Sequence, residues 1–165
     1  VCKDRAVCTQ QSSVWNIFMS KELRYPFLII REKEQIREAN RVIREIGFTS
    51  ELINADSPVG NLSGGERQGV AIARAIYNNA ELIILDEPTN NLSLNETQKV
   101  FDFVLNVKKS NRSVLFIGHN IYHVYDISDR FVILDRGEVV HQINKEDIGT
   151  PEELMKIMRD TIKSH

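Results

Sequence analysis

The sequence predicts an α/β fold, in which a parallel sheet is flanked by helices and an α-helical subdomain occupies the N-terminal half. Two observations predict the sheet. The apolar runs at residues 82–86 and 114–117 lack polar alternation, which is typical of strands buried on both faces. Strand and helix patterns also alternate from residue 82 to residue 134. We therefore predict a helical subdomain over residues 1–78 and a sheet-containing part over residues 79–165.

Composition places the chain among ordinary globular proteins. Of its 165 residues, 42% are hydrophobic and 27% are charged, so one domain with a real core is expected. The formal net charge of −2 gives no electrostatic sign of a nucleic-acid partner. Cys2 and Cys8 are too few for a disulfide framework and match no common zinc pattern, which favours a reducing compartment. No apolar run approaches the ~20 residues of a membrane helix, and the start does not resemble a signal peptide, so we expect a cytoplasmic protein.

The N-terminal half contains two apolar patterns of helical type. A short apolar patch over residues 14–19 predicts a helical turn. Residues 31–46 predict an amphipathic helix, and Gly47 follows where a left-handed C-terminal cap is wanted. The charges on its other face alternate in sign, which is typical of a solvated surface. The apolar stripe of this helix consists of Ile36, Ala39, Ile43 and Ile46.

Three capping boxes predict the starts of three further helices. In such a box, a Ser or Thr side chain and the side chain of a Glu three residues later each bind the backbone of the other residue. The boxes are Ser63 with Glu66, Ser93 with Glu96, and Thr150 with Glu153. We expect the first helix to end near Asn78, the second near Lys109, and the third to begin with Pro151. The second helix is expected to turn four side chains inward, namely Val100, Phe101, Val104 and Leu105.

The remaining elements follow the second apolar run. Residues 120–127 predict a crossover helix between parallel strands. Residues 131–134 and 138–140 predict two strands, joined by a tight turn over residues 135–137.

Asp86 and Glu87 come directly after the apolar run 82–85, with Pro88 and Thr89 following. A carboxylate at the tip of a buried strand can hold Mg²⁺, and a second carboxylate beside it can order an attacking water. The alternative is a turn carboxylate without function, but this combination of residues favours the functional interpretation. His119 follows the second apolar run at the sheet edge where α/β proteins bind ligands. A lone histidine there is often structural, whereas one beside Asp86 and Glu87 is a candidate to contact a γ-phosphate.

Ser63, Gly64 and Gly65 open the first capped helix. They either allow a tight entry into the helix or let a phosphate approach the exposed N–H groups at its positive end. Because a helix terminus reaches outward, we expect such a phosphate to belong to a nucleotide held by another chain. The sequence contains no Gly-Lys dipeptide, so the lysine-bearing phosphate loop is lacking and only half a nucleotide site is predicted.

Taken in order, residues 62–68 (Leu-Ser-Gly-Gly-Glu-Arg-Gln), residues 86–89 (Asp-Glu-Pro-Thr) and His119 closely resemble the ATP-binding subunit of an ABC transporter. Residues 16–19, residues 71–75 and the pair Leu92-Ser93 look most like the bacterial importers of simple sugars. The resemblance covers nearly the whole chain, and it matches the part of the family domain after the phosphate loop. It implies that Ser63, Gly64 and Gly65 form the family signature, the segment that closes over a nucleotide on the opposing subunit. It also implies a partial P-loop NTPase-like sheet, with residues 1–78 as the helical signature subdomain and residues 79–165 as the distal part of the catalytic core.

The resemblance also implies roles for single residues. Asp86 would coordinate Mg²⁺, Glu87 would act as general base, and His119 would touch the γ-phosphate. Ser93 stands where many relatives have aspartate, and Lys3 replaces the glutamine that senses Mg²⁺ and water. The residues implied to bind nucleotide, partly across a subunit interface, are Ser63, Gly64, Gly65, Gln68, Asn91, Ser93 and Lys3.

The same resemblance implies partners and a limit. The complete subunit would pair head to tail with a second ATPase subunit around two Mg-ATP molecules and drive transmembrane permease subunits, so that it touches the inner face of the membrane only through them. The phosphate loop and an adenine-stacking aromatic would precede Val1, so we expect this chain alone to bind ATP very weakly and not to hydrolyse it. The family strand between residues 114–117 and 131–134 would also be missing, and we expect that gap to be closed by direct pairing of these strands or by another chain.

Two other functions remain open. The chain could be a non-catalytic module that docks its signature helix on an intact ATPase subunit. It could also be the head of a DNA-repair-type ATPase, which is disfavoured because no heptad run is present.

Overall fold

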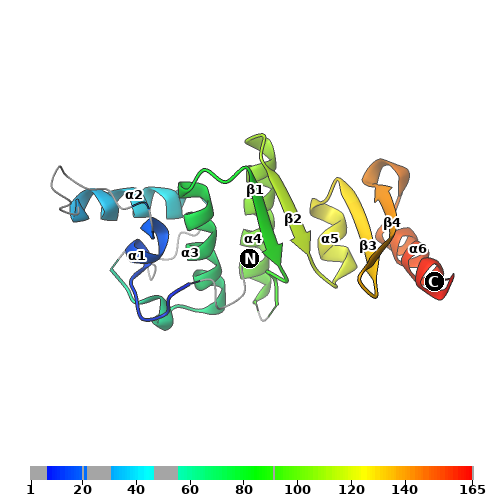
Figure 1. The fold of residues 1–165 in the computed structure, drawn as a ribbon, viewed down its shortest axis with the longest axis horizontal. Helices are drawn as coiled ribbons and strands as arrows, with labels where there is room; N and C mark the ends of the chain where they lie inside the picture. Colours follow the sequence, from blue (N-terminus) through cyan, green and yellow to red (C-terminus); the bar gives the residue numbers. More distant parts are fainter. Residues whose placement is uncertain (1–6, 20, 22–30, 47–55, 91, 165) are drawn as a thin grey trace. The chain divides into compact units, whose positions relative to one another are not determined.

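A computed structural model describes residues 7–19, 21, 31–46, 56–90 and 92–164. The chain divides into two compact units, Val1–Ile117 and Gly118–His165, and each is described by itself (Figure 1). The boundary predicted between residues 78 and 79 stays a prediction. Of the residues to which the sequence analysis gives a role, Cys2, Lys3, Gly47 and Asn91 lie outside the described residues. Among the helices that are described, none has the length and apolar character needed to cross a membrane.

Three helices form the N-terminal part of the first unit. They are α1 (Ser13–Phe18), α2 (Glu32–Glu45) and α3 (Gly64–Tyr77), with a 3-10 turn, η1 (Val59–Asn61), shortly before α3. Both α1 and α2 pack against α3 (Figure 1). The helices predicted over residues 14–19, 31–46 and from Ser63 are therefore confirmed, to within one residue at each end. Their buried side chains include Ile17, Phe18, Val42, Ile43, Val70 and Ile72.

Asn16 fixes the segment that precedes α1. Its side chain is fully buried and accepts a hydrogen bond from the backbone N–H of Cys8 at 2.7 Å. Its amide group donates to the backbone oxygens of Cys8 and Ser12, each at 3.0 Å. A buried amide must find such partners, because an unsatisfied one costs about 1–3 kcal/mol. Asn16, which helped to indicate the family, therefore has a structural role here.

The parallel sheet of the first unit consists of β1 (Leu82–Asp86) and β2 (Ser113–Ile117). Its register runs from Leu82 opposite Ser113 to Asp86 opposite Ile117. Parallel strands need a crossover, and α4 (Leu94–Lys109) provides it and packs against β2. The predicted parallel pairing is confirmed.

The inward face of α4 differs from the predicted one. Val100 and Val104 are buried as expected, but Phe101 is half-buried and Leu105 is 37% exposed. Phe103 is buried in their place, at 1% exposure. The observed stripe has the spacing of one helical face. It consists of Val100, Phe103, Val104 and Val107.

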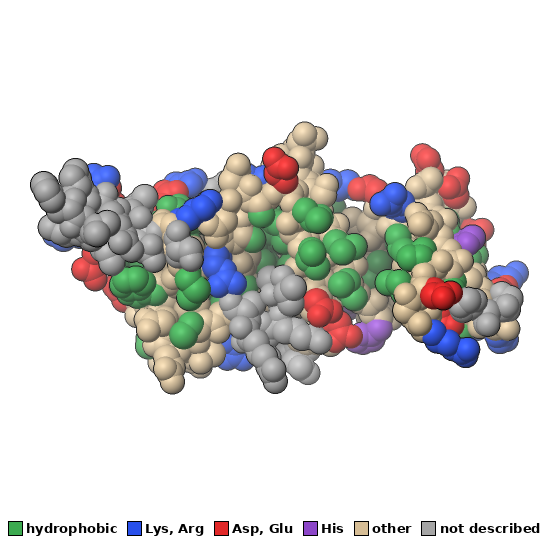
Figure 2. Space-filling view, in the orientation of Figure 1, with side chains coloured by type: hydrophobic (Ala, Val, Ile, Leu, Met, Phe, Trp, Pro, Cys, Tyr) green, Lys and Arg blue, Asp and Glu red, His purple; other side chains and the backbone are tan. Residues whose placement is uncertain are grey.

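The prediction that both strands are buried on both faces is wrong. Ile83 and Leu85 are buried, whereas Leu82, Leu115 and Ile117 are 55%, 48% and 44% exposed. These exposed side chains share one face of the sheet, because Leu82 lies level with Ser113 and Asp86 with Ile117 in the register. Figure 2 shows hydrophobic side chains gathered on that face.

The second unit is a hairpin with two helices. α5 (Ile121–Ile127) is followed by β3 (Arg130–Asp135), β4 (Glu138–Asn144), a 3-10 turn, η2 (Lys145–Asp147), and α6 (Pro151–Ser164). The two strands are antiparallel, and Arg136 and Gly137, at φ 47° and 88°, form the predicted tight turn. The core of this unit consists of Phe131, Ile133, Ile143, Ile148 and Leu154.

The strands of the second unit follow the predicted strand, turn and strand. Within the described residues, β2 is hydrogen-bonded to β1 in the first unit and β3 to β4 in the second. The closure of the gap between residues 114–117 and 131–134, and the crossover role of α5, stay predictions. β3 also alternates, with Phe131 and Ile133 buried and Leu134 64% exposed. Only one face of the hairpin packs on its helices.

Candidate functional site

The start of α3 has the capping box that the sequence predicts. The hydroxyl oxygen of Ser63 accepts a hydrogen bond from the backbone N–H of Glu66 at 3.2 Å, and the Glu66 carboxylate accepts one from the N–H of Ser63 at 2.8 Å. Gly64 and Gly65 are the first two residues of the helix. The first backbone N–H groups of a helix lack helical partners and carry the positive end of the helix dipole. This terminus is therefore suited to an anion.

A carboxylate from α4 already lies at this terminus. The Ser63 hydroxyl donates to Glu96 Oε1 at 3.0 Å. Glu96 Oε2 accepts from the backbone N–H and the hydroxyl of Ser93, at 2.9 and 2.8 Å. The hydrogen bonds from Ser93 hold the pKa of the Glu96 carboxyl below its ordinary value of 4.5, and the Ser63 hydroxyl and the Gly65 backbone add to this against the effect of burial. One carboxylate thus links the starts of two helices.

Gly65 permits this approach. A Cβ atom at Gly65 would lie 2.5 Å from Glu96 Oε1 and 2.7 Å from its Cδ, which is too close for real atoms. A Cβ atom at Gly64 would meet only a methyl carbon of Leu92, at an ordinary 3.7 Å. The two glycines therefore differ, because only the second is required by a neighbouring side chain.

A second group of predicted residues lies at the end of β1. Asp86 and Glu87 are half-buried, and Glu87 has a φ of 48°, a left-handed conformation that is unusual for a residue other than glycine. Its backbone N–H donates to the oxygen of Ile117 at 2.9 Å. The Asn90 side-chain amide donates to Glu87 Oε2 at 2.6 Å. These bonds hold the Glu87 carboxylate beside the carboxyl ends of both strands, where α/β proteins bind ligands.

The other predicted site residues lie in different places. His119 lies in the second unit, where it is exposed, two residues after the end of β2 in the sequence. Gln68 has a buried Nε2 atom without a hydrogen-bond partner. Ser93 is the N-cap of α4. The roles given to these residues stay predictions, as do those of Lys3 and Asn91.

The residues present fit a Mg²⁺ ion that is bound together with phosphate. No group of three or more His, Cys, Asp or Glu side chains within the described part of the chain could hold a metal by itself. Mg²⁺ does not need such a cage, since it is usually held by one or two carboxylates, waters and substrate phosphates. Asp86, at the end of β1, offers a carboxylate of this kind.

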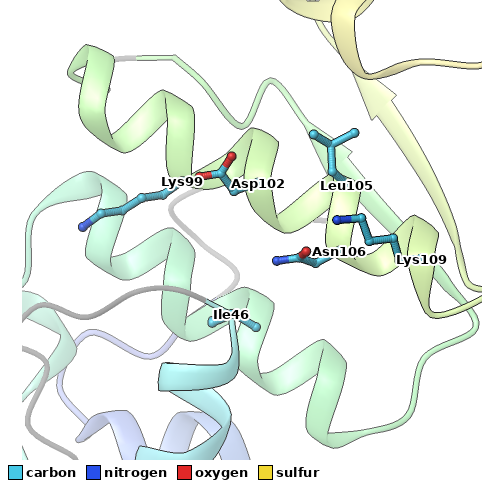
Figure 3. Close-up of a pocket in the computed structure, with 6 residues that line it drawn as sticks. All are labelled: Ile46, Lys99, Asp102, Leu105, Asn106 and Lys109. Atoms are coloured by element: carbon cyan, nitrogen blue, oxygen red, sulfur yellow. The ribbon is translucent and has the colours of Figure 1, made fainter.

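The pocket shown in Figure 3 lies away from these groups. It has a volume of about 340 Å³ and lies between the end of α2 and α4. No predicted site residue lines it. Its lining consists of Ile46, Lys99, Asp102, Leu105, Asn106 and Lys109.

Glu96 is the residue that sequence reasoning missed. Its capping box was recognised, but only as the start of a helix. Its contact with Ser63 joins residues 33 positions apart, and no local pattern shows such a contact.

Sequence comparison supports the resemblance. The sequence model described as ABC transporter matches residues 3–90, more than half of the chain. The xylose/arabinose import ATP-binding protein XylG of Sulfolobus acidocaldarius is 35% identical over 158 residues, which are 96% of this chain and 61% of that protein. The ribose import ATP-binding protein RbsA 2 of Escherichia coli O157:H7 is 33% identical over 87% of this chain and 27% of that protein. The chain thus spans less than two thirds of the curated relatives that it matches.

Solved structures show the same fold. The dimeric ATP-binding cassette MJ0796 bound to ADP and Pi aligns with a TM-score of 0.72 at 23% identity, over 88% of this chain and 61% of that one. A nucleotide-free ATP-binding cassette from an ABC transporter aligns with a TM-score of 0.71 at 21% identity, over 92% of this chain and 60% of that one. The predicted partial P-loop NTPase-like α/β fold is confirmed by these likenesses.

Proposed function

The chain belongs to the ABC transporter family, and from this premise we propose that it is the signature-bearing part of an ATP-binding subunit of a sugar importer. The relatives named above are import proteins for xylose and arabinose or for ribose, which supports a sugar as the cargo. The observation that carries the proposal is the start of α3, where Ser63 caps a helix whose first two residues are Gly64 and Gly65, within the matched segment.

The start of α3 would bind a phosphate group of a nucleotide held by a second subunit. The Ser63 hydroxyl donates its hydrogen, at present to Glu96 Oε1, and the adjacent backbone N–H groups are at the positive end of the helix, where an anion gains about 0.3–2 kcal/mol. A glycine at each of the next two positions lets phosphate oxygens approach the backbone. The complete protein would therefore work as a pair of ATPase subunits, each of which completes the site of the other.

The end of β1 would carry the chemistry of ATP hydrolysis. Asp86 would hold Mg²⁺, which neutralises charge on the β- and γ-phosphates when it is bound. Glu87 would orient the attacking water, and the hydrogen bond from Asn90 Nδ2 would keep its carboxylate in place. His119 would contact the γ-phosphate. ATP bound between two subunits would then drive transport through the permease subunits. The permease subunits would also hold the protein at the inner face of the membrane.

These 165 residues alone should bind ATP very weakly and not hydrolyse it. The sequence has no Gly-Lys dipeptide, and a triphosphate without a phosphate loop loses most of its charge-assisted contacts. An effect on ATP hydrolysis is therefore expected only when the chain is mixed with an intact ATPase subunit.

The test is the effect of this chain on ATP turnover by the full-length E. coli relative. We expect the chain to change that turnover in proportion to its concentration, and Ser63→Ala to abolish the effect. Thr150→Ala removes the N-cap hydroxyl of α6 instead and should behave as the unchanged protein does. An increase in turnover supports a subunit part that completes the site, whereas a decrease supports a non-catalytic module that occupies it. No effect, or an effect that does not depend on Ser63, contradicts the proposal.

A further inference from the structure

The donors that the proposed function assigns to phosphate are already engaged within the chain. The Ser63 hydroxyl donates to Glu96 Oε1 at 3.0 Å, and the Gly65 backbone adjoins the same carboxylate and helps to lower its pKa. The side chain comes close enough that a Cβ at Gly65 would overlap it, at 2.5 Å. A native anion thus lies at the terminus of α3, in the place that suits a phosphate oxygen.

Glu96 and a phosphate cannot use this place together. A serine hydroxyl has a single hydrogen to donate, and so does each backbone N–H. A carboxylate and a phosphate at contact distance would also repel each other, since both are negative at neutral pH. Binding of one therefore requires displacement of the other.

We propose that Glu96 is an internal competitor for phosphate, and that its carboxylate must leave Ser63 before a phosphate group binds the start of α3. This inference rests on the proposed function, which assigns Ser63 and Gly65 to phosphate binding. Glu96 is therefore a residue that sets the affinity of the signature for phosphate without touching the reacting atoms.

The geometry allows Glu96 to leave without unfolding its own helix. Oε1 faces Ser63, while Oε2 accepts two hydrogen bonds from Ser93 and completes the cap of α4. Rotation of the carboxylate away from Ser63 leaves the cap bonds of α4 available. Ser93, the N-cap of α4, thereby contacts the same carboxylate as Ser63.

The test measures phosphate binding to the whole chain by NMR, from the backbone amide signal of Gly65. Inorganic phosphate and ATP are titrated in separate arms, so that a phosphate group alone is distinguished from a nucleotide. Glu96→Gln keeps an acceptor oxygen for the α4 cap but removes the charge, and we expect about ten-fold tighter binding than in the unchanged protein. Glu153→Gln removes the same charge from the start of α6, where the carboxylate accepts from the Gly149 N–H, and should leave the affinity unchanged.

A measurement on the unchanged protein covers the case in which the variant folds poorly. We expect the carboxyl carbon signal of Glu96 to titrate below the usual range without phosphate and to move upward when phosphate is added. Three results would overturn the inference. Glu96→Gln and the unchanged protein could bind phosphate with equal affinity, neither could bind it, or the Glu96 carboxyl could titrate at its ordinary value. If Ser63 controls the turnover of the intact relative while Glu96→Gln binds no tighter, this inference fails and the proposed function stands. If binding tightens but turnover never depends on Ser63, the reverse holds.

Discussion

Substitution of the two glycines at the start of α3 should have opposite effects. Alanine in a helix is usually more stable than glycine by roughly 0.5–1 kcal/mol, because glycine loses more backbone freedom on folding. Gly64→Ala should show part of this gain, since its Cβ meets nothing closer than Leu92 at 3.7 Å. Gly65→Ala should instead destabilise the first unit, because its Cβ would overlap the Glu96 carboxylate.

The size of the second effect follows from what Glu96 would lose. The atoms that the new Cβ would meet are the far end of a flexible side chain, so Glu96 moves aside and α3 does not. It then loses its bond to Ser63, and a hydrogen bond to a charged group is worth about 1.5–3 kcal/mol. Ser63 is exposed and water replaces part of this, so after the helix gain we expect a net loss of about 1 kcal/mol.

Urea unfolding followed by tryptophan fluorescence measures this difference. The only tryptophan of the chain, Trp15, lies on α1 in the first unit and reports on that unit alone. With a denaturant slope of about 1–3 kcal/mol/M, the midpoint of Gly65→Ala should fall by roughly 0.3–1 M, while that of Gly64→Ala stays or rises. A Gly65→Ala protein as stable as Gly64→Ala would show that Glu96 does not lie against this helix start in solution.

Three further outcomes are expected. Phe103→Ala should lower the free energy of unfolding of the first unit by about 3–5 kcal/mol, and Leu105→Ala by less than about 1 kcal/mol, because Phe103 is 1% exposed and Leu105 37%. Urea unfolding followed by Trp15 fluorescence measures both, and similar losses would contradict the observed face of α4. Folding lowers the pKa of the Glu96 carboxyl, so its contribution to the free energy of unfolding is present above pH 4.5 and is lost as the pH falls below 4.5. In urea unfolding, the difference in stability between the unchanged protein and Glu96→Gln should therefore shrink below pH 4.5. A difference that stays constant would count against the contact. Gly137→Ala should destabilise the β3–β4 hairpin by about 1 kcal/mol, because a φ of 88° is strained for alanine. Amide hydrogen exchange in β3 and β4 should then become faster, and unchanged exchange would refute this.

The sequence predicts those features whose signal lies within a few residues. The capping boxes at Ser63, Ser93 and Thr150 correctly placed three helix starts, because cap and partner are three positions apart. The tight turn at Arg136 and Gly137 is equally local. The motifs that indicated the family are short and ordered, and the family is confirmed by comparison.

The wrong predictions concern what covers an element. An apolar run shows that a strand can be buried on both faces, but it does not show whether both are covered, and Leu115 and Ile117 are exposed. On α4, apolar residues at adjacent positions allowed two faces, and the packing against β2 selected Phe103 over Phe101. The partners of a strand likewise depend on contacts between residues far apart in sequence, and within its own unit β2 pairs with β1 and β3 with β4.

The two oxygens of Glu96 explain why a capping glutamate can also act at the signature. A cap needs one acceptor for the backbone N–H at the helix start, and Glu96 Oε2 fulfils this through Ser93. The other oxygen, Oε1, is not needed for the cap and accepts a hydrogen bond from Ser63 instead, in the space that the missing Cβ of Gly65 leaves. Glutamine at this position would keep the acceptor and lose the charge, so the helix cap and the competition with phosphate are separable by one substitution. A residue that serves only as a cap would show no such separation, because its loss would change stability without changing the affinity for phosphate.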